Sequence, residues 1–216
     1  MNQSFVTDLP LYLSGLFTTL TVSLAGIAIS VVLGIALAAA LRSSLRLISI
    51  PARLYVEFAR GAPLALVLFL IYYGGPQFGL VLSPYFAGIA GLGLYGAGPF
   101  AEIFRAGFNA VPEGEIEAAA MLGLNSGQSF RNIALPQALA LTLPPSIGQA
   151  INLVKESSVL SVITLGELTK VAGTISSISF AVVTPYLTIA LIYWAIVEAL
   201  SQLGFHVERR LAVKGL

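Results

Sequence analysis

The chain contains no cysteine, a single histidine and few charged residues. The absence of cysteine excludes disulfides, iron–sulfur clusters and thiolate zinc sites. Charged residues make up 10% of the 216 positions against 57% hydrophobic residues, and the mean hydropathy is +0.91. A water-soluble domain needs more polar surface than this, so the sequence predicts an integral membrane protein.

Other absences narrow the function. The net charge is +1 and no basic cluster is long, so we expect no nucleic-acid partner. The nucleotide-binding pattern G-x-x-x-x-G-K-[S/T] is missing, which predicts that the chain is not an ATP-hydrolysing enzyme. The one histidine, His206, lies among charges of the carboxyl-terminal tail, so we expect no metal site and no cofactor on this chain.

Long uncharged runs predict an all-α membrane protein with five transmembrane helices, because each crossing needs ~20 apolar residues. The spans are expected at about residues 16–41, 54–73, 80–104, 137–155 and 182–203, within one transmembrane domain over residues 1–216. No basic region precedes the first apolar run, so we expect this span to be retained rather than cleaved. Pro144 and Pro145 should kink or interrupt the fourth span.

Basic residues gather on one side of these spans. They are Arg42, Arg46, Arg53, Arg60, Arg105, Arg131, Arg209, Arg210 and Lys214. On the other side, the connection after the second span has no charge and the one after the fourth has Lys170 with Glu167. Cytoplasmic loops are enriched in lysine and arginine, which predicts the N-terminus outside and the C-terminus inside.

The cytoplasmic connection over residues 112–136 has the composition of two short helices. A proline and three glutamates suit the first turn of a helix, and the alanines that follow are strong helix formers. Gly123 can end this helix in the left-handed conformation, and Asn125 or Ser126 can cap a second helix that we expect to run to Asn132. The pair would form a compact knob; a surface loop with good helix propensity is the alternative.

The spacing of Glu117, Ala118 and Ala119, then Gly123, then Ile133-x-Leu135-Pro136 resembles the cytoplasmic EAA loop of bacterial ABC-importer permeases. The stretches "YVEFARGAPLALVLFLIYYGGP", "AEIFRAGFNAVPEGEIEAAAMLGL" and "LPQALALTLPPSIGQAINLVKESSVLSVI" look like the polar amino acid permease family, whose members are type I importers. The likeness covers most of the chain from about residue 55 to 211, whereas the first 50 residues match more loosely.

This resemblance implies a multi-pass permease subunit of the bacterial cytoplasmic (inner) membrane. It would move a small polar amino acid inward by alternating access, and two ABC ATPase subunits would bind the ATP and Mg. The other implied partners are a second permease chain, identical or homologous, and an extracytoplasmic solute-binding protein.

The resemblance also assigns roles within the loop. Glu117 would be a charged anchor for the ATPase, Ala118 and Ala119 would allow its close approach, and Gly123 would permit the bend. The last motif residues, Ile133, Leu135 and Pro136, would fix the knob to the fourth span.

Polar groups at membrane depth are candidates for a substrate pathway, because charges in hydrocarbon are costly and usually face a wet interior. Lys155, Glu156, Ser157 and Ser158 follow the doubled proline and form the first candidate group. The alternative is that the charged pair marks the end of the span and reaches the interface.

Glu57 and Arg60 form a second candidate group, although residues three apart on one helix can simply pair with each other. Glu102 and Arg105 have the same spacing, and a structural pair is favoured there. The role of Glu198, a lone acid in the last span, stays open.

Two other functions remain alternatives. A half-unit of an ion-coupled secondary transporter would use intramembrane acids and need no ATPase. A non-transporting membrane anchor for an ATPase would need only the knob.

Overall fold

The computed structural model describes the backbone of residues 2–213 and the side chains of residues 8–209. The expected all-helical fold is confirmed: the described residues form helices and connecting turns, without strands. Arg210 and Lys214, which contributed to the predicted orientation, lie outside the described side chains.

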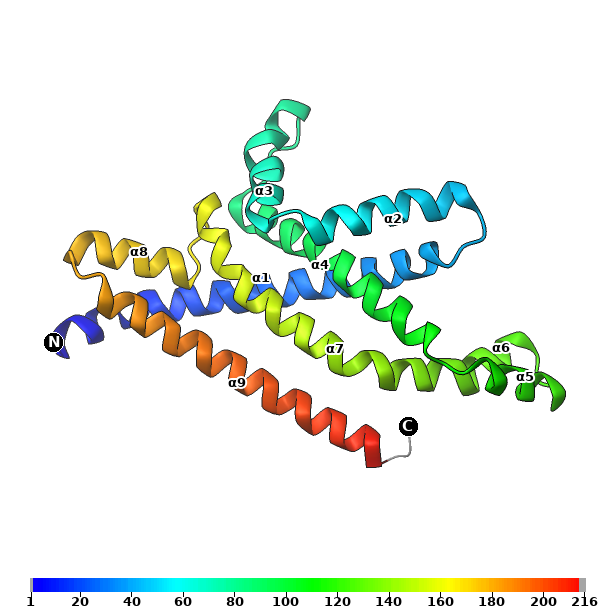
Figure 1. Cartoon of the computed structure of the whole chain (residues 1–216). Coiled ribbons are helices and arrows are strands. Elements are labelled where there is room, and N and C mark those ends of the chain that lie inside the picture. The colour runs from blue at the N-terminus through cyan, green and yellow to red at the C-terminus, as the bar shows by residue number, and fades with distance from the viewer. Residues whose placement is uncertain (1, 214–216) are drawn as a thin grey trace.

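Helices are arranged as one elongated bundle (Figure 1). The elements are α1 (Asn2–Leu41), α2 (Arg46–Gly61), α3 (Leu64–Phe69), the π-helical η1 (Leu70–Gly74), the 3₁₀ η2 (Gly75–Phe78), α4 (Pro84–Asn109), α5 (Glu113–Met121), α6 (Ser126–Ser129), the π-helical η3 (Phe130–Ala134), α7 (Leu135–Glu156), the 3₁₀ η4 (Ser157–Ile163), α8 (Leu168–Ser179) and α9 (Val183–Val213).

Two described helices are long and apolar enough to cross a membrane, Asp8–Leu41 and Val183–Arg209. Two bent pairs, Arg46–Gly61 with Leu64–Phe78 and Ser126–Ile163 with Leu168–Ser179, raise the number of candidate spans to at most four. The third expected span corresponds to α4, a glycine-rich helix of 26 residues that is not among these candidate spans. The count of five crossings thus stays a prediction.

Helix α4 lies at the centre of the bundle and packs mainly against α1. Small residues bring the two helices close together: a Cβ atom on Gly26 would lie 2.7 Å from the Leu92 side chain, and one on Gly34 would lie 2.6 Å from that of Phe100. Ser30 donates hydrogen bonds of 3.1 Å to the backbone carbonyls of Leu92 and Gly93. Small residues in α4 therefore allow its close packing against α1.

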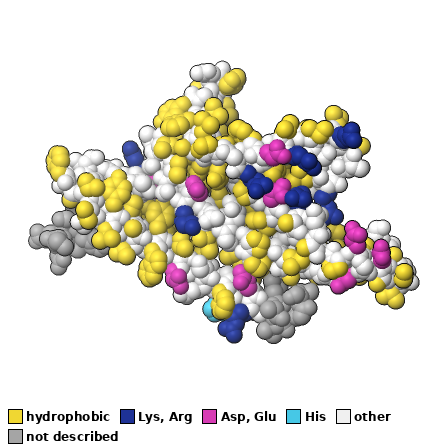
Figure 2. Space-filling model, viewed as in Figure 1, with side chains coloured by type: hydrophobic (Ala, Val, Ile, Leu, Met, Phe, Trp, Pro, Cys, Tyr) yellow, Lys and Arg dark blue, Asp and Glu magenta, His cyan; other side chains and the backbone are white. Residues whose placement is uncertain are grey.

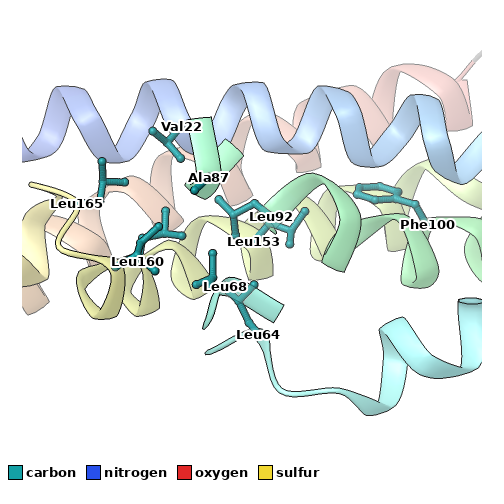
Figure 3. Close-up of a cluster of buried hydrophobic side chains, with 10 residues drawn as sticks. Val22, Leu64, Leu68, Ala87, Leu92, Phe100, Leu153, Leu160 and Leu165 are labelled. Atoms are coloured by element: carbon teal, nitrogen blue, oxygen red, sulfur yellow. The ribbon is translucent and has the colours of Figure 1, made fainter. Parts of the chain in front are cut away.

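The main hydrophobic core surrounds α4. Side chains from α1, α3, α4, α7 and η4 turn toward one another (Figure 3). Leu68, Leu92, Leu153 and Leu160 are fully buried there. Burying a leucine contributes ~1.5–3 kcal/mol relative to leaving it exposed, so this cluster holds the five elements together.

The second expected span is not one continuous helix. Helix α2 ends at Gly61, and α3 begins at Leu64 after a bend of 111°. Ala62 is extended (φ −81°, ψ 138°), as expected of a residue before proline, because the ring of Pro63 crowds the helical conformation. Residues 54–73 therefore belong to two differently directed helices.

Pro144 and Pro145 were expected to kink or interrupt the fourth span, and the interruption is wrong, whereas the kink stays a prediction. Helix α7 continues through Pro144 and Pro145 to Glu156. The regular helix ends at Ser157, where the 3₁₀ turn η4 begins, and this turn ends at Thr164 in the left-handed conformation (φ 62°). The interruption thus follows the prolines by three turns of helix.

Candidate functional site

Helices α5 and α6 project from the end of the bundle at which α1 and α4 terminate (Figure 1). Pro112 precedes α5, and Glu113 and Glu115 lie in its first turn, where negative charge is favourable. The Asn125 side chain accepts the Gln128 N–H (2.9 Å), and the Gln128 side chain accepts the Asn125 N–H (3.0 Å). This capping box starts α6, so local sequence chemistry builds both helices.

Gly123 closes α5 in the left-handed conformation, with φ +83°. Its N–H donates to the Ala120 carbonyl (3.0 Å), and the Leu124 N–H donates to the Ala119 carbonyl (3.1 Å). These two bonds are the Schellman motif, which satisfies carbonyls at a helix end. The sharp reversal at residue 123 agrees with the sequence prediction.

We call residues 113–134 the knob. The second helix does not stop at Asn132 as expected, because α6 passes through the π turn η3 directly into α7. Pro136 lies in the first turn of α7 and has no N–H to donate to a carbonyl of the preceding turn, which a wider π turn accommodates. Ile133, Leu135 and Pro136 are half-buried at this junction.

An aromatic stack ties the knob to the bundle. Phe130 of η3 stacks on Phe108 of α4, with ring centroids 5.8 Å apart and planes inclined by 14°. The guanidinium of Arg42, which follows α1, lies 5.6 Å from the Phe108 centroid and donates to Asn109 Oδ1 at 3.2 Å. We call Arg42, Phe108 and Phe130 the stack; it joins residues from three segments distant in sequence.

The knob presents an acidic face and an apolar tip. Figure 2 shows acidic side chains gathered over its α5 end. Glu113 and Glu117, one helical turn apart, line a hollow of about 580 Å³ that also includes Arg42 and Phe130. At the tip, Met121 is 88% exposed and Leu122 is 82% exposed.

The two motif alanines differ in their surroundings. Ala118 is exposed, as a surface that another protein approaches would require. Ala119 is only 1% exposed, so its small side chain serves packing inside the knob rather than a partner's approach. Glu115, on α5, interacts with the side chain of Gln137 at the start of α7 and thereby adds a second link to the bundle.

Glu57 and Arg60 line a polar cavity of about 380 Å³ between α2 and α4. Glu102, Arg105, Arg42 and Arg53 share it. Arg105 donates to Glu102 at 2.6 and 3.0 Å, as the sequence spacing suggests. Glu57 and Arg60, in contrast, form no such pair within the described residues, so their predicted mutual pairing is wrong.

The other candidate group lies outside this cavity. Lys155 is exposed and Glu156 half-buried at the end of α7. Ser157 is fully buried and donates to the Val154 carbonyl at 2.7 Å, so its hydroxyl hydrogen is used within its own helix end. Ser158 is half-buried. The structure therefore does not bring the two predicted pathway groups together in one cavity.

A buried carboxylate was missed by sequence reasoning. Glu167 is fully buried at the start of α8, where it accepts the N–H groups of Thr169 (2.7 Å) and Lys170 (2.8 Å). The Tyr193 hydroxyl of α9 donates to it at 3.1 Å. Its position directly before an apolar helix was a sequence signal for an N-cap, although the tyrosine contact could not be foreseen.

The family described as "Binding-protein-dependent transport system inner membrane component" matches residues 30–213. The chain is 37% identical over 191 residues to the probable amino-acid ABC transporter permease protein YckA of Bacillus subtilis, covering 88% of this chain and 84% of that one. It is 36% identical to the probable glutamine ABC transporter permease protein GlnM of the same organism, over 98% of both chains. A crystal structure of an amino acid ABC transporter with histidines is 37% identical, with a TM-score of 0.90 over 96% of this chain and 97% of that one.

Proposed function

The chain belongs to the family of binding-protein-dependent transport system inner membrane components, and we propose that it is the permease subunit of an importer for a small polar amino acid. Its relatives are amino-acid ABC transporter permeases. ATP and Mg would bind to two separate ATPase subunits, and this chain would supply the membrane path.

The proposed topology has five crossings with the N-terminus outside the cell. Helices α1, α4 and α9 provide three of them, and the bent segments α2–η2 and α7–α8 provide the others. Most residues of α4 are buried or half-buried against neighbouring helices, so this crossing would lie inside the bundle. Arginine side chains gather at the end of the bundle that carries the knob, which supports a cytoplasmic location for that end (Figure 2).

The knob is the observation that carries this proposal. Its exposed tip of Met121 and Leu122 and its acidic hollow with Glu117 are suited to a cleft on an ATPase subunit. Large exposed apolar side chains outside the membrane usually mark a protein contact. The stack gives the docked knob a direct connection to α1 and α4, so a displacement of the knob would move the helices that form the centre of the bundle.

The transport cycle would be alternating access. Two ATPase subunits close on ATP and move two knobs, one from each of two permease chains. An extracytoplasmic binding protein delivers the amino acid, which passes polar groups in the bundle. Lys155, Glu156 and Ser158 on one side, and Glu57 and Arg60 in the cavity toward the cytoplasm, are the proposed polar groups of this path.

The proposal is tested by ATP hydrolysis and amino-acid uptake in proteoliposomes that contain this chain, its ATPase and its binding protein. Glutamine, arginine, glutamate and histidine are compared for the wild type, for Glu117→Arg and for Glu208→Arg as a charge-reversal control on α9. We expect one amino acid to stimulate hydrolysis and uptake, and only Glu117→Arg to abolish the stimulation.

Each alternative function gives a different result. Uptake that follows an ion gradient without ATP would identify a secondary transporter. ATPase binding without any uptake would identify an anchor. Either result overturns the importer.

A further inference from the structure

A second groove lies on the exposed surface of α2, near its amino-terminal end, and it shares Arg53 with the polar cavity that Glu57 and Glu102 line. It has a volume of about 290 Å³ and is lined by Arg46, Ser49, Ile50, Arg53 and Leu54. Arg46 and Arg53 are seven residues apart, which places them on one helical face with Ser49 between them. The groove therefore combines two guanidinium groups, a hydroxyl and two apolar side chains, and no carboxylate lines it.

Both arginines of the groove lack a hydrogen-bonding partner among the side chains that the structure describes. Neither Arg46 nor Arg53 forms a hydrogen bond or an ion pair within the described residues, whereas Arg105 pairs with Glu102 and Arg42 bonds to Asn109. The Ser49 hydroxyl donates its hydrogen to the Leu45 carbonyl at 3.3 Å, so the two guanidinium groups are the donors that the groove offers. Two unpaired, forked donors fit an anion with several acceptor oxygens, and phosphate is the group that arginine recognises best in this way.

The apolar wall of the groove continues along the helix. Ile50 is 54% exposed and Leu54 is 62% exposed, and Leu47 and Phe58 extend this stripe at intervals of three or four residues. The face that α2 buries against the bundle is a different one, formed by Ala52, Val56 and Ala59. Helix α2 thus has a basic face next to an uncovered apolar face, which is the pattern of helices that contact lipid headgroups and acyl chains together.

We propose that this groove binds an anionic phospholipid of the cytoplasmic leaflet. Arg46 and Arg53 hold the phosphate, and an acyl chain lies along Ile50 and Leu54. The assignment to this leaflet rests on the proposed topology, which places the basic end of the bundle in the cytoplasm, where negatively charged lipids attract arginine.

The test uses the full permease–ATPase complex in nanodiscs of equal phosphatidylglycerol and phosphatidylcholine content. Native mass spectrometry measures which lipid the complex retains. We compare the wild type with the double variant Arg46→Gln/Arg53→Gln, with Arg46→Lys/Arg53→Lys, and with Arg209→Gln as a control arginine at the same end of the bundle.

We expect the wild type and Arg209→Gln to retain phosphatidylglycerol roughly 30-fold over phosphatidylcholine, from two surface arginines. The preference of the glutamine variant should fall to within about twofold. The lysine variant keeps both charges but not the forked geometry, so its preference should lie between those of the glutamine variant and the wild type. Equal retention of both lipids by the wild type, or an unchanged preference in the glutamine variant, would overturn the proposal.

Two soluble competitors separate a lipid from a free phosphate. We expect neither inorganic phosphate nor glycerophosphoglycerol, the headgroup without acyl chains, to displace the bound lipid at millimolar concentration. Displacement by either would show a plain anion site and overturn the lipid assignment. The lipid measurement needs no transport, so a complex that fails to import amino acids but keeps the lipid preference would refute the proposed function alone.

Discussion

Substitution of Gly123 by alanine tests the knob directly, because the cost of this change can be calculated from the backbone. Gly123 has φ +83°, and a Cβ atom built on it meets nothing within 4 Å. The change therefore causes no steric clash and imposes only the left-handed strain of an L-residue, ~1–2 kcal/mol. If residue 123 instead leaves the left-handed conformation, the two hydrogen bonds of the Schellman motif break, and the turn between α5 and α6 changes.

Gly79 provides a matched control. It has φ +79°, its added Cβ also meets nothing within 4 Å, and it follows η2, far in sequence from the knob. Alanine there should cost the same ~1–2 kcal/mol. We expect both variants to lower the unfolding temperature by similar amounts.

Only the knob variant should weaken coupling. A strain of ~1–2 kcal/mol lowers the equilibrium constant between the intact and the altered knob roughly 5- to 30-fold. Amino-acid-stimulated ATP hydrolysis in proteoliposomes measures the effect, and Gly123→Asn should retain more activity because asparagine tolerates this conformation. Equal losses of stimulation in the Gly123 and Gly79 variants, or none in either, would refute the assignment of coupling to the knob.

Three further substitutions test other parts of the structure. Phe130→Leu removes a stacked pair worth ~0.5–1.5 kcal/mol, so stimulated hydrolysis should fall about two- to tenfold and the unfolding temperature by no more than in Gly79→Ala; a loss of stability with unchanged stimulation would contradict this role. Glu167→Gln places an amide NH₂ opposite one of the buried N–H groups, so the free energy of unfolding should fall by ~1–3 kcal/mol. Thermal unfolding measures this, and an unchanged unfolding temperature would argue against the three hydrogen bonds that Glu167 accepts. In Gly96→Ala the new methyl group would overlap the Ser30 hydroxyl and lower the free energy of unfolding by ~1–3 kcal/mol, whereas Gly148→Ala, in open space, should be neutral or stabilising. Similar unfolding temperatures for the two variants would argue against the close contact between α1 and α4.

The knob helices could be predicted from the sequence because their determinants are local. A proline and glutamates begin α5, a glycine ends it, and the Asn125 cap lies only three residues from its Gln128 partner. The end of α6 was predicted wrongly because nothing local stops the helix at Asn132. The π turn that continues it depends on Pro136 and on the packing of Phe130, which a propensity argument does not include.

The errors in the spans have a common physical origin. Hydropathy measures how favourably a segment lies in lipid, and it contains no information on the direction of the helix axis. It therefore did not predict the 111° bend after Gly61. The Ala62–Pro63 pair was the local signal for extended backbone at this point. The helix-breaking effect of Pro144 and Pro145 was overestimated, because α7 continues through both residues. The start of η4 supplies the break instead, and it lies where α7 meets α8 and the buried Glu167.

The contacts that make the knob part of a mechanism lie between distant positions. Arg42 and Phe108 are 66 residues apart, and Phe108 and Phe130 are 22 residues apart, so a single sequence gives no reason to join them. Their arrangement nevertheless limits how the molecule can work. The stack attaches the knob to the ends of α1 and α4, and these two helices are held in close contact along their length by small residues. A displacement of the knob therefore reaches the α1–α4 pair as a unit, whereas α9 contacts α7 and α8 and packs against α1 only near Tyr12 and Leu16, at the end of α1 far from the knob. Weakening the stack should consequently separate ATP hydrolysis from transport without unfolding the bundle, which distinguishes a transmitting contact from one that only stabilises the fold.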